Sequence, residues 1–250
     1  MIIDIHTHLA QYYDKPKKLA HLMDVAERFD IQRFCSFMGS LPLSQQPTQR
    51  EIRQANDLTL ALMKRYKDRV VGFCYLNPNH TRTCIDELNR CMEAGMRGVK
   101  FWVAALCNEP IVFPIIERAI ELDVPVLQHA WKHTDKSLKR ESEPAHIADL
   151  AGRYPQVKLI MAHAPAAWQY AIKMVRPYDN VVVDTSGANA TQGFMEMALH
   201  ELGAERIVFG SDVPKARGFA SQLAKVDGVK MSKTARRLIL AENARKLLKL

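Results

Sequence analysis

The sequence predicts an α/β fold with a single domain over residues 1–250, a (β/α)8 barrel of the TIM type, and three observations support this prediction. Short apolar segments alternate with amphipathic helical segments along the whole chain, and eight such pairs can be counted. Strands that alternate with helices pair in parallel through right-handed crossovers. Several strands, such as Val181–Val183, are continuous apolar runs, which is typical of a sheet buried on both faces. The length of 250 residues matches that of a closed barrel.

The predicted strands are short segments rich in β-branched and other apolar residues, and turn-forming or charged residues flank them. The first begins next to the N-terminus, and the last is followed by a polar segment. In chain order they span Ile2–His6, Ile31–Phe37, Val70–Leu76, Gly98–Trp102, Val124–His129, Val157–His163, Val181–Thr185 and Arg206–Ser211.

The predicted helices place apolar side chains at intervals of three and four residues, the period of an amphipathic helix. In the first helix these residues are Leu19, Leu22, Met23 and Ala26. The helices are expected at Pro16–Phe29, Arg50–Tyr66, Thr81–Ala94, Pro114–Leu122, Pro144–Tyr154, Ala166–Val175 and Gln192–Leu202. A basic helix near Lys230–Leu250 ends the chain, where it either packs on the barrel or helps to form a homodimer.

The composition excludes several classes of protein. Hydrophobic residues make up 48% of the chain and charged residues 25%, as in an ordinary globular protein. No apolar run approaches the roughly 20 residues that cross a bilayer, and Met1 leads directly into a strand, so we expect a cytoplasmic protein without a membrane segment. The five cysteines are odd in number and lack Cys-x-x-Cys spacing, which argues against a disulfide framework or a structural zinc finger.

The net charge of +8 is the only feature that favours a polyanionic partner. Charge that is dispersed along the chain is typical of a solvated surface, so nucleic acid is not the expected partner. No Gly-x-Gly-x-x-Gly or Gly-x-x-x-x-Gly-Lys turn follows a strand, which removes the usual nucleotide-binding alternatives. We expect a small-molecule substrate instead.

The first strand carries two histidines on one face. Side chains alternate between the faces of a strand, so Asp4, His6 and His8 point to the same side. Imidazole is the commonest nitrogen ligand of zinc and similar ions, and a His-x-His pair on a strand presents two such ligands to one ion. For the pair alone, histidines that only pack against their neighbours explain the sequence equally well. The remaining ligands have to come from other strands.

Polar residues also interrupt the carboxyl ends of later strands, where the active site of a (β/α)8 barrel lies. They are Lys100 in strand four, His129 and His163 at the ends of strands five and six, and Asp212 after strand eight. Singly, each histidine fits a hydrogen-bonded structural role and the aspartate fits a helix N-cap. Together with the two histidines of strand one they favour a functional site. Burying all six without a metal or other partners would cost several kcal/mol.

The pattern resembles that of the amidohydrolase superfamily, and more closely that of its amidohydrolase-2 group, which includes aminocarboxymuconate-semialdehyde decarboxylase and small lactone hydrolases. The site residues that carry the resemblance are Asp4-x-His6-x-His8, Lys100, His129, His163 and Ser211-Asp212. Three further segments are similar to sequences of that group: Asn56-Asp57, Arg69–Phe73 and Asn243–Leu248. The resemblance implies a distorted (β/α)8 barrel that binds a divalent metal, usually zinc.

Carried over residue by residue, the resemblance implies a metal held by four side chains, His6, His8, His129 and Asp212. Three imidazoles and one carboxylate leave a coordination position for water or substrate. Such an ion lowers the pKa of its water and polarises a carbonyl oxygen. Asp212 then takes up a proton, and His163 acts as general acid or base or polarises the substrate. Asp4 has an orienting role behind the ligands, whereas Asp184, at the end of strand seven, is not counted among the site residues.

Lys100 leaves the number of metals open. In some members of the superfamily a lysine of strand four is carboxylated and bridges two metals, and His163 is then a ligand as well. The other interpretation is a lysine that hydrogen-bonds near the site or contacts an anionic substrate. Trp102 and Trp131, which follow strands four and five, either stack on the substrate or pack in the wall. A basic segment, Lys132–Arg140, either attracts a carboxylate-bearing substrate or is a solvated loop.

We therefore expect an enzyme, a metal-dependent hydrolase of a small carbonyl compound such as an amide, lactone or ester, with one or two zinc ions. The alternative is a non-oxidative decarboxylase of an unsaturated or aromatic carboxylic acid, because the same metal site supports it. A third hypothesis is a metal-dependent DNase of the TatD type, which also opens on His-x-His. That group typically has a glutamate where this chain has Lys100. The last hypothesis is a non-catalytic barrel that only binds a metal or a ligand.

Overall fold

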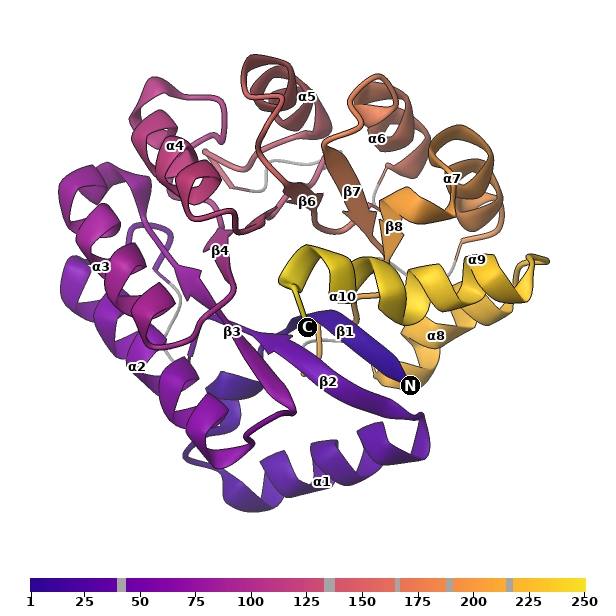
Figure 1. The fold of residues 1–250 in the computed structure, drawn as a ribbon, viewed down its shortest axis with the longest axis horizontal. Coiled ribbons are helices and arrows are strands. Elements are labelled where there is room, and N and C mark those ends of the chain that lie inside the picture. Colours follow the sequence, from indigo (N-terminus) through magenta and orange to yellow (C-terminus); the bar gives the residue numbers. More distant parts are fainter. Residues whose placement is uncertain (40–43, 133–137, 165–166, 188–190, 215–217) are drawn as a thin grey trace.

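A computed structural model describes residues 1–39, 44–132, 138–164, 167–187, 191–214 and 218–250. Eight parallel strands pair in chain order inside a ring of helices, so the chain folds as a single (β/α)8 barrel, as predicted (Figure 1). The strands are β1 (Ile2–Thr7), β2 (Ile31–Ser36), β3 (Val70–Tyr75), β4 (Gly98–Phe101), β5 (Val126–Gln128), β6 (Leu159–Met161), β7 (Val181–Asp184) and β8 (Ile207–Val208).

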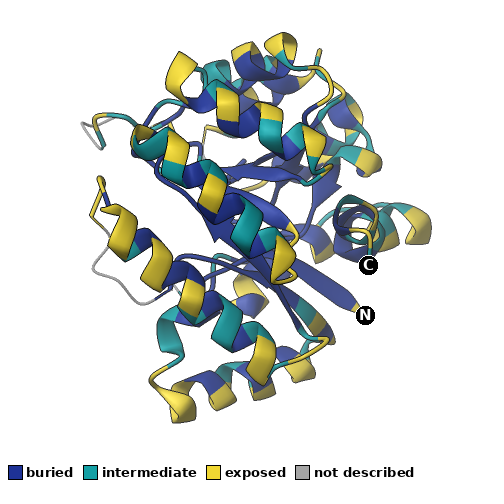
Figure 2. Cartoon of the chain, turned by 60° about the vertical axis from the view of Figure 1, so that its left-hand side comes forward, coloured by how far each residue is buried: buried dark blue, intermediate teal, exposed yellow. Residues whose placement is uncertain are grey.

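Helices cover the outside of the barrel and expose their outer faces (Figure 2). Those that follow the strands are α1 (Pro16–Arg28), α2 (Gln49–Arg65), α3 (Thr81–Glu93), α4 (Phe113–Glu121), α5 (Pro144–Arg153), α6 (Trp168–Val175), α7 (Phe194–Leu202) and α8 (Phe219–Asp227). Short 3-10 helices are η1 (Leu9–Tyr12), η2 (Pro78–His80), η3 (Pro110–Val112) and η4 (Ala204–Arg206). Helix α8 is absent from the prediction, and the first residue of the predicted helix Ala166–Val175 lies outside the described residues.

The strands separate two hydrophobic layers, because their side chains alternate between the faces of the sheet. In β6, Ile160 belongs to the inner layer of the barrel, whereas Leu159 and Met161 pack in the outer layer beneath the helices. Val182 of β7 is likewise an inner residue. All residues of these two strands are buried, and each such apolar side chain stabilises the fold by roughly 1.5–3 kcal/mol. This double burial accounts for the continuous apolar runs in the sequence.

The barrel closes through the chain that follows β8 rather than through β8 itself, which has two residues. This chain runs beside β1. The backbone N of Asp212 donates to the carbonyl O of His6 at 2.8 Å, and the backbone N of His8 donates to the carbonyl O of Val213 at 2.7 Å. The closure therefore sets Asp212 beside the two histidines of β1, at the carboxyl end of the barrel.

The C-terminal segment forms α9 (Lys233–Arg237), the π-helical turn η5 (Leu238–Glu242) and α10 (Asn243–Leu248), which lie across the ring of strands near both termini (Figure 1). Ala244 and Leu248 join the inner layer. Asn243 Nδ2 donates to the carbonyl oxygens of Ala204 and Ile207 at 2.7 and 2.8 Å. The basic segment thus packs on the barrel, one of its two expected roles, and a homodimer contact stays a prediction.

Two further expectations concern the membrane and the cysteines. Within the described residues, no helix has both the length and the apolar character that a membrane crossing requires. All five cysteines lie in the described part of the chain, and all are buried thiols outside any disulfide. Burial raises the pKa of Cys107 to about 12, which keeps this thiol protonated and unreactive.

Candidate metal-binding active site

Three side chains from the first and last strands meet at the carboxyl end of the barrel. The Nε2 atoms of His6 and His8 lie 3.4 Å and 3.1 Å from Oδ1 of Asp212. His6 Nε2 and Asp212 Oδ1 are buried, and neither has a well-oriented hydrogen bond among the described residues. Two imidazole nitrogens and a carboxylate oxygen are donors that zinc and related ions accept, so this group fits a divalent metal.

The two aspartates beside these histidines differ in environment. Burial would raise the pKa of Asp212, but the close imidazoles of His8 and His6 lower it well below its usual value, so Asp212 is ionised. Burial raises the pKa of Asp4 to about 7, although its Oδ1 accepts hydrogen bonds from the backbone N of His6 and of Ser211 at 3.1 and 3.0 Å. Asp4 therefore joins the two ligand-bearing segments through their backbones rather than through an imidazole.

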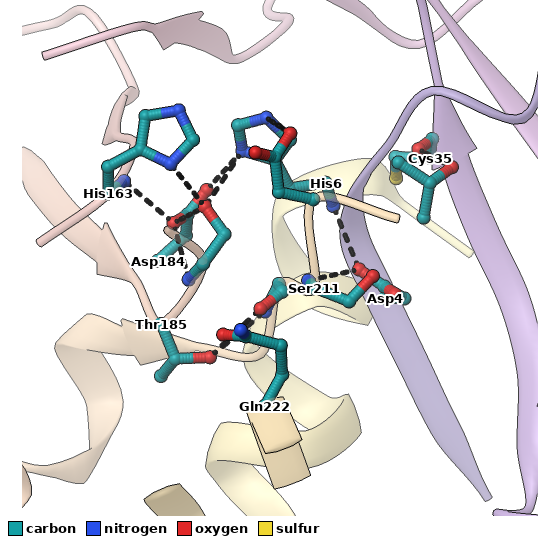
Figure 3. Close-up of polar contacts among 12 residues, drawn as sticks. Asp4, His6, Cys35, His163, Asp184, Thr185, Ser211 and Gln222 are labelled. Atoms are coloured by element: carbon teal, nitrogen blue, oxygen red, sulfur yellow. Dashed lines mark hydrogen bonds and ion pairs between the residues drawn. The ribbon is translucent and has the colours of Figure 1, made fainter. Parts of the chain in front are cut away.

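Asp184, the last residue of β7, connects two of the histidines (Figure 3). Its Oδ2 accepts a hydrogen bond from Nδ1 of His6 at 2.7 Å, and its Oδ1 accepts from the backbone N of His163 at 3.0 Å. Burial would raise the pKa of Asp184, but the charge and hydrogen bond of His6 lower it. The ionised carboxylate accepts from Nδ1–H of His6 and so directs Nε2 of the same ring toward Asp212.

Ser186 extends this arrangement to the ring of His163. Its hydroxyl donates to Oδ1 of Asp184 at 2.6 Å, and its oxygen lies 3.0 Å from Nδ1 of His163. Because a carboxylate only accepts, the hydroxyl oxygen accepts from Nδ1–H of His163 and leaves Nε2 as an acceptor. Burial is the main cause that lowers the pKa of His163 well below its ordinary value, and the neighbouring His129 and His6 lower it further. His163 is therefore neutral at pH 7.

The position of His163 depends on a glycine and an aromatic ring. Gly187 has a φ of +93°, and a Cβ there would lie 2.9 Å from Cβ and Nδ1 of His163. Only glycine fits this conformation and this space without strain. The ring of Trp131 meets the ring of His163 edge-on at a centroid distance of 5.5 Å. Of the predicted substrate contacts, Trp131 thus borders the site, whereas Trp102 is half-buried and packs against the inner layer.

His129 lies at the same end of the barrel but not with the other predicted ligands. Its ring is 4.8 Å from that of His163, and its Nε2 is 2.6 Å from Oε1 of Glu141. The described residues form two groups whose ligand atoms lie within 4.8 Å of one another, His6–His8–Asp212 and His6–His163–Asp184, and His129 belongs to neither. Its role as a metal ligand therefore stays a prediction.

Lys100 of β4 is 1% exposed and faces the histidines. Its Nζ lies 5.2 Å from the centroid of the Phe37 ring, which contacts the rings of His6 and His8 at 5.1 and 4.9 Å. The charge of Lys100 also contributes to the lowered pKa of His163, after burial and the other histidines. A buried ammonium group therefore shares the site with the histidines. Of the basic segment Lys132–Arg140, residues 133–137 lie outside the described part of the chain.

A family model for amidohydrolases, Amidohydro_2, matches residues 3–250. The chain belongs to the amidohydrolase-2 family. This match confirms the resemblance found in the sequence, and it extends over the whole barrel. No curated protein matches this chain significantly in sequence.

Solved structures share the fold of this chain over nearly its whole length. 2,6-Dihydroxybenzoate decarboxylase from Rhizobium has 19% identity and a TM-score of 0.76, with 99% of this chain and 98% of that chain covered. A dihydroxybenzoic acid decarboxylase from Polaromonas, with bound manganese and the inhibitor 2-nitroresorcinol, has 19% identity, a TM-score of 0.79 and coverage of 100% and 97%. 5-Carboxyvanillate decarboxylase from Sphingomonas paucimobilis has 12% identity, a TM-score of 0.76 and coverage of 100% and 99%. At these identities the likeness establishes the fold.

The site contains four residues that are not among the predicted site residues: Phe37, Glu141, Asp184 and Ser186. For two of them the sequence holds a signal, because Asp184-Thr185-Ser186 directly follows the apolar run Val181–Val183. Polar residues at that point of a barrel face the active site. Glu141 offers no comparable signal, since a long loop separates it from β5.

Proposed function

We propose that this amidohydrolase-2 protein is a metal-dependent, non-oxidative decarboxylase of a small aromatic acid, which the sequence analysis ranked as the alternative to a hydrolase. The observation that carries the proposal is the buried ammonium of Lys100, which lies near His163 and the three-residue ligand group. A buried cation that faces a site raises the affinity of the site for an anion, whatever else it contacts. A carboxylate substrate gains from this charge, whereas a neutral amide, lactone or ester does not.

The structural neighbours support the same choice of reaction. The three described above are decarboxylases of aromatic acids and share the fold with coverage of at least 97% of their own chains. The rings of Phe37 and Trp131, which border the histidines, suit a flat aromatic substrate. We extend the proposal to the whole chain, residues 1–250, as one catalytic domain.

The metal belongs to the proposal as well. We assign its ligands to His6, His8 and Asp212, with His129 as the fourth, because the first three already converge. Zinc fits imidazole and carboxylate donors, and manganese, the ion of one structural neighbour, fits them too. A divalent ion, once bound, stabilises negative charge on substrate oxygens. Because Lys100 is used for the substrate in this proposal, we favour a single ion over a bridged pair.

The reaction replaces the bond between a ring carbon and its carboxylate by a bond to hydrogen, and the carboxylate leaves as carbon dioxide. One proton is consumed. Asp212 is ionised before the reaction, so we assign to it the relay of this proton: its side chain, 19% exposed, takes up a proton from solvent and passes it to the ring carbon as the carboxylate leaves. Nε2 of His163, left as an acceptor by Ser186, accepts a hydrogen bond from a substrate hydroxyl. This bond raises the electron density of the ring, which favours protonation of carbon. Lys100 holds the anionic substrate in place.

The test is a comparison of carbon dioxide release and ester hydrolysis by the same preparation. Protein stripped with a chelator and then loaded with zinc or manganese is incubated with 2,6-dihydroxybenzoate, 5-carboxyvanillate, a lactone and an aryl ester. We expect carbon dioxide from at least one acid, only in the metal-loaded protein, and no hydrolysis above the metal-free level. Metal-dependent hydrolysis without carbon dioxide release from any acid would overturn the proposal.

The hydrolase remains the second candidate. The group of His6, His8 and Asp212 beside a neutral His163 would also serve the attack of water on a carbonyl carbon, with Asp212 as the proton acceptor. This reaction requires no buried cation, which is why it ranks second. The DNase hypothesis gains no support from the family match.

A further inference from the structure

The segment that follows β5 carries a carboxylate deep in the site. Oε1 of Glu141 lies 2.6 Å from Nε2 of His129, and the side chains of Glu141 and His129 are 6% and 13% exposed. The contact joins a residue at the end of β5 to one that follows it by twelve positions. A nearly buried carboxylate in contact with a predicted metal ligand can orient that ligand. For this, the residues on each side of Glu141 must also be held in position.

Both neighbours of Glu141 are fixed to other parts of the barrel. Arg140 forms an ion pair with Glu109, at the start of η3. The hydroxyl of Ser142 accepts a hydrogen bond from the backbone N of Cys107 at 3.0 Å. The backbone is therefore held on each side of Glu141, and the carboxylate is positioned before any ligand binds.

The contact has a counterpart at His6. Asp184 binds Nδ1 of His6, and Nε2 is the nitrogen that faces Asp212. At His129 the carboxylate lies on the other nitrogen, because Glu141 binds Nε2. A carboxylate on the second nitrogen of a metal-binding imidazole fixes the orientation of the ring and makes the first nitrogen a better donor.

We propose that Glu141 is the positioning residue of His129: it accepts the hydrogen bond from Nε2–H, so that Nδ1 is the nitrogen with which His129 binds the metal. This inference rests on the proposed metal site. Glu141 acts through His129 and is not itself a ligand. The long loop after β5 thus has a defined task, which is to carry this carboxylate into the site.

The test measures the affinity of the metal-free protein for Co2+ by competition with a chromophoric chelator, and it needs no substrate. Glu141→Ala should raise the Kd about 10–100-fold, the usual effect of losing such a partner. Glu141→Gln should raise it less, because the amide oxygen still accepts from Nε2–H. The control is Glu143→Gln in the same segment, where the carboxylate binds Lys132 at 2.7 Å and neither residue touches a histidine of the site. The Kd of this control should not change.

A second pair of variants separates positioning from direct ligation. In a His129→Ala background, Glu141→Ala should leave the Kd and the visible absorption of bound Co2+ unchanged, because the residue through which it acts is gone. A further loss of affinity by the full single-variant factor would make Glu141 an independent ligand and overturn the proposal. So would a wild-type Kd in Glu141→Ala. Circular dichroism checks the fold, and the isosteric Glu141→Gln carries the comparison where the alanine variant does not fold.

A failure of the Glu141 proposal can be distinguished from a failure of the decarboxylase proposal. Wild-type protein that binds no Co2+ would refute the metal site, and with it the role of Glu141. Wild-type protein that binds Co2+ but releases no carbon dioxide would refute the decarboxylase alone. The comparison of Glu141→Ala with wild type then remains decisive for the positioning role.

Discussion

At the scale of single residues, the site depends on which nitrogen of each imidazole is hydrogen-bonded to a neighbouring side chain. Asp184 takes Nδ1 of His6 directly and Nδ1 of His163 through Ser186. Both contacts are made at Nδ1, so Nε2 lies on the opposite side of each ring, and in His6 it faces Asp212. Since neutral imidazole has one donor and one acceptor nitrogen, a single carboxylate sets the proton positions of two groups with different tasks.

Lys100→Met is expected to weaken substrate binding more than catalysis. The methionine is similar in length and fills the same space without the charge, so the KM for an aromatic acid should rise about 10–100-fold, the loss expected for an anion that no longer meets a buried cation. Steady-state kinetics of carbon dioxide release give KM and kcat separately. A KM that stays at the wild-type value would remove Lys100 from substrate binding.

Gly187→Ala should disturb His163, because the new methyl group would lie 2.9 Å from its ring at a φ of +93°. We expect a loss of about 1–3 kcal/mol in the free energy of unfolding and a lower kcat. Gly218→Ala is the matched control, since nothing lies within 4 Å of the added carbon. Urea unfolding and turnover are measured for both variants. Equal effects at the two positions would contradict this explanation of Gly187.

The sequence predicts the positions of site residues at the ends of strands. It does not predict the positions of site residues in the segments between strands and helices. His6, His8 and Asp212 could be predicted to meet because strand ends are found from apolar runs and barrel strands end at one side. Glu141 could not, since its position depends on contacts such as those of Arg140 and Ser142, which no periodicity records. His129 shows the same limit, because its contact with Glu141 depends on the placement of that residue.

At the scale of elements, Glu87 of α3 connects two helices around the outer core. Its Oε1 accepts from Asn56 of α2 at 3.0 Å and from Arg90 of its own helix at 2.6 Å. Burial would raise the pKa of Glu87, but the hydrogen bonds of Arg90 and Asn56 lower it. An ionised carboxylate is therefore part of the packing between α2 and α3, at a distance from the site.

Glu87→Gln should lower the free energy of unfolding by about 1–3 kcal/mol at pH 7. Because the pKa of Glu87 is lower in the folded protein, its contribution is complete above the unfolded value of about 4.3 and is lost as the pH falls through the folded value. The difference between variant and wild type should thus shrink below about pH 4.3, as measured by urea unfolding at pH 7 and at acidic pH. Glu121→Gln, which removes an exposed ion pair with Arg118, should change little. A pH-independent difference would exclude this explanation.

The elements themselves were mostly predictable, and the two exceptions have physical reasons. Helix α8 carries Phe219, Leu223 and Val226 at helical spacing and was overlooked although the signal is present. Strand β8 was predicted as Arg206–Ser211 but ends at Val208, because the residues after it bond to β1 and η5 instead of continuing the ladder. An apolar run shows that a segment is buried but does not show its hydrogen-bond partners.

At the scale of the whole molecule, the proposed metal would connect the first strand of the barrel to the segment that follows the last strand. An ion that binds only the folded state stabilises it by about 2.7 kcal/mol when its concentration is 100 times the Kd. For a chain of this size, we expect the Tm to rise by roughly 5–10 °C under those conditions. Differential scanning calorimetry with and without zinc tests this, and the His6→Ala/His8→Ala variant should show no shift. A shift of equal size in that variant would place the ion elsewhere.

The closure of the barrel by the segment around Asp212 also has a consequence for synthesis on the ribosome. His6 is synthesised first, and its partner Asp212 follows 206 residues later in the chain. A nascent or truncated chain that stops before Asp212 lacks the third donor and cannot form the group. Metal uptake at this group would therefore begin only after the segment that follows β8 has been synthesised.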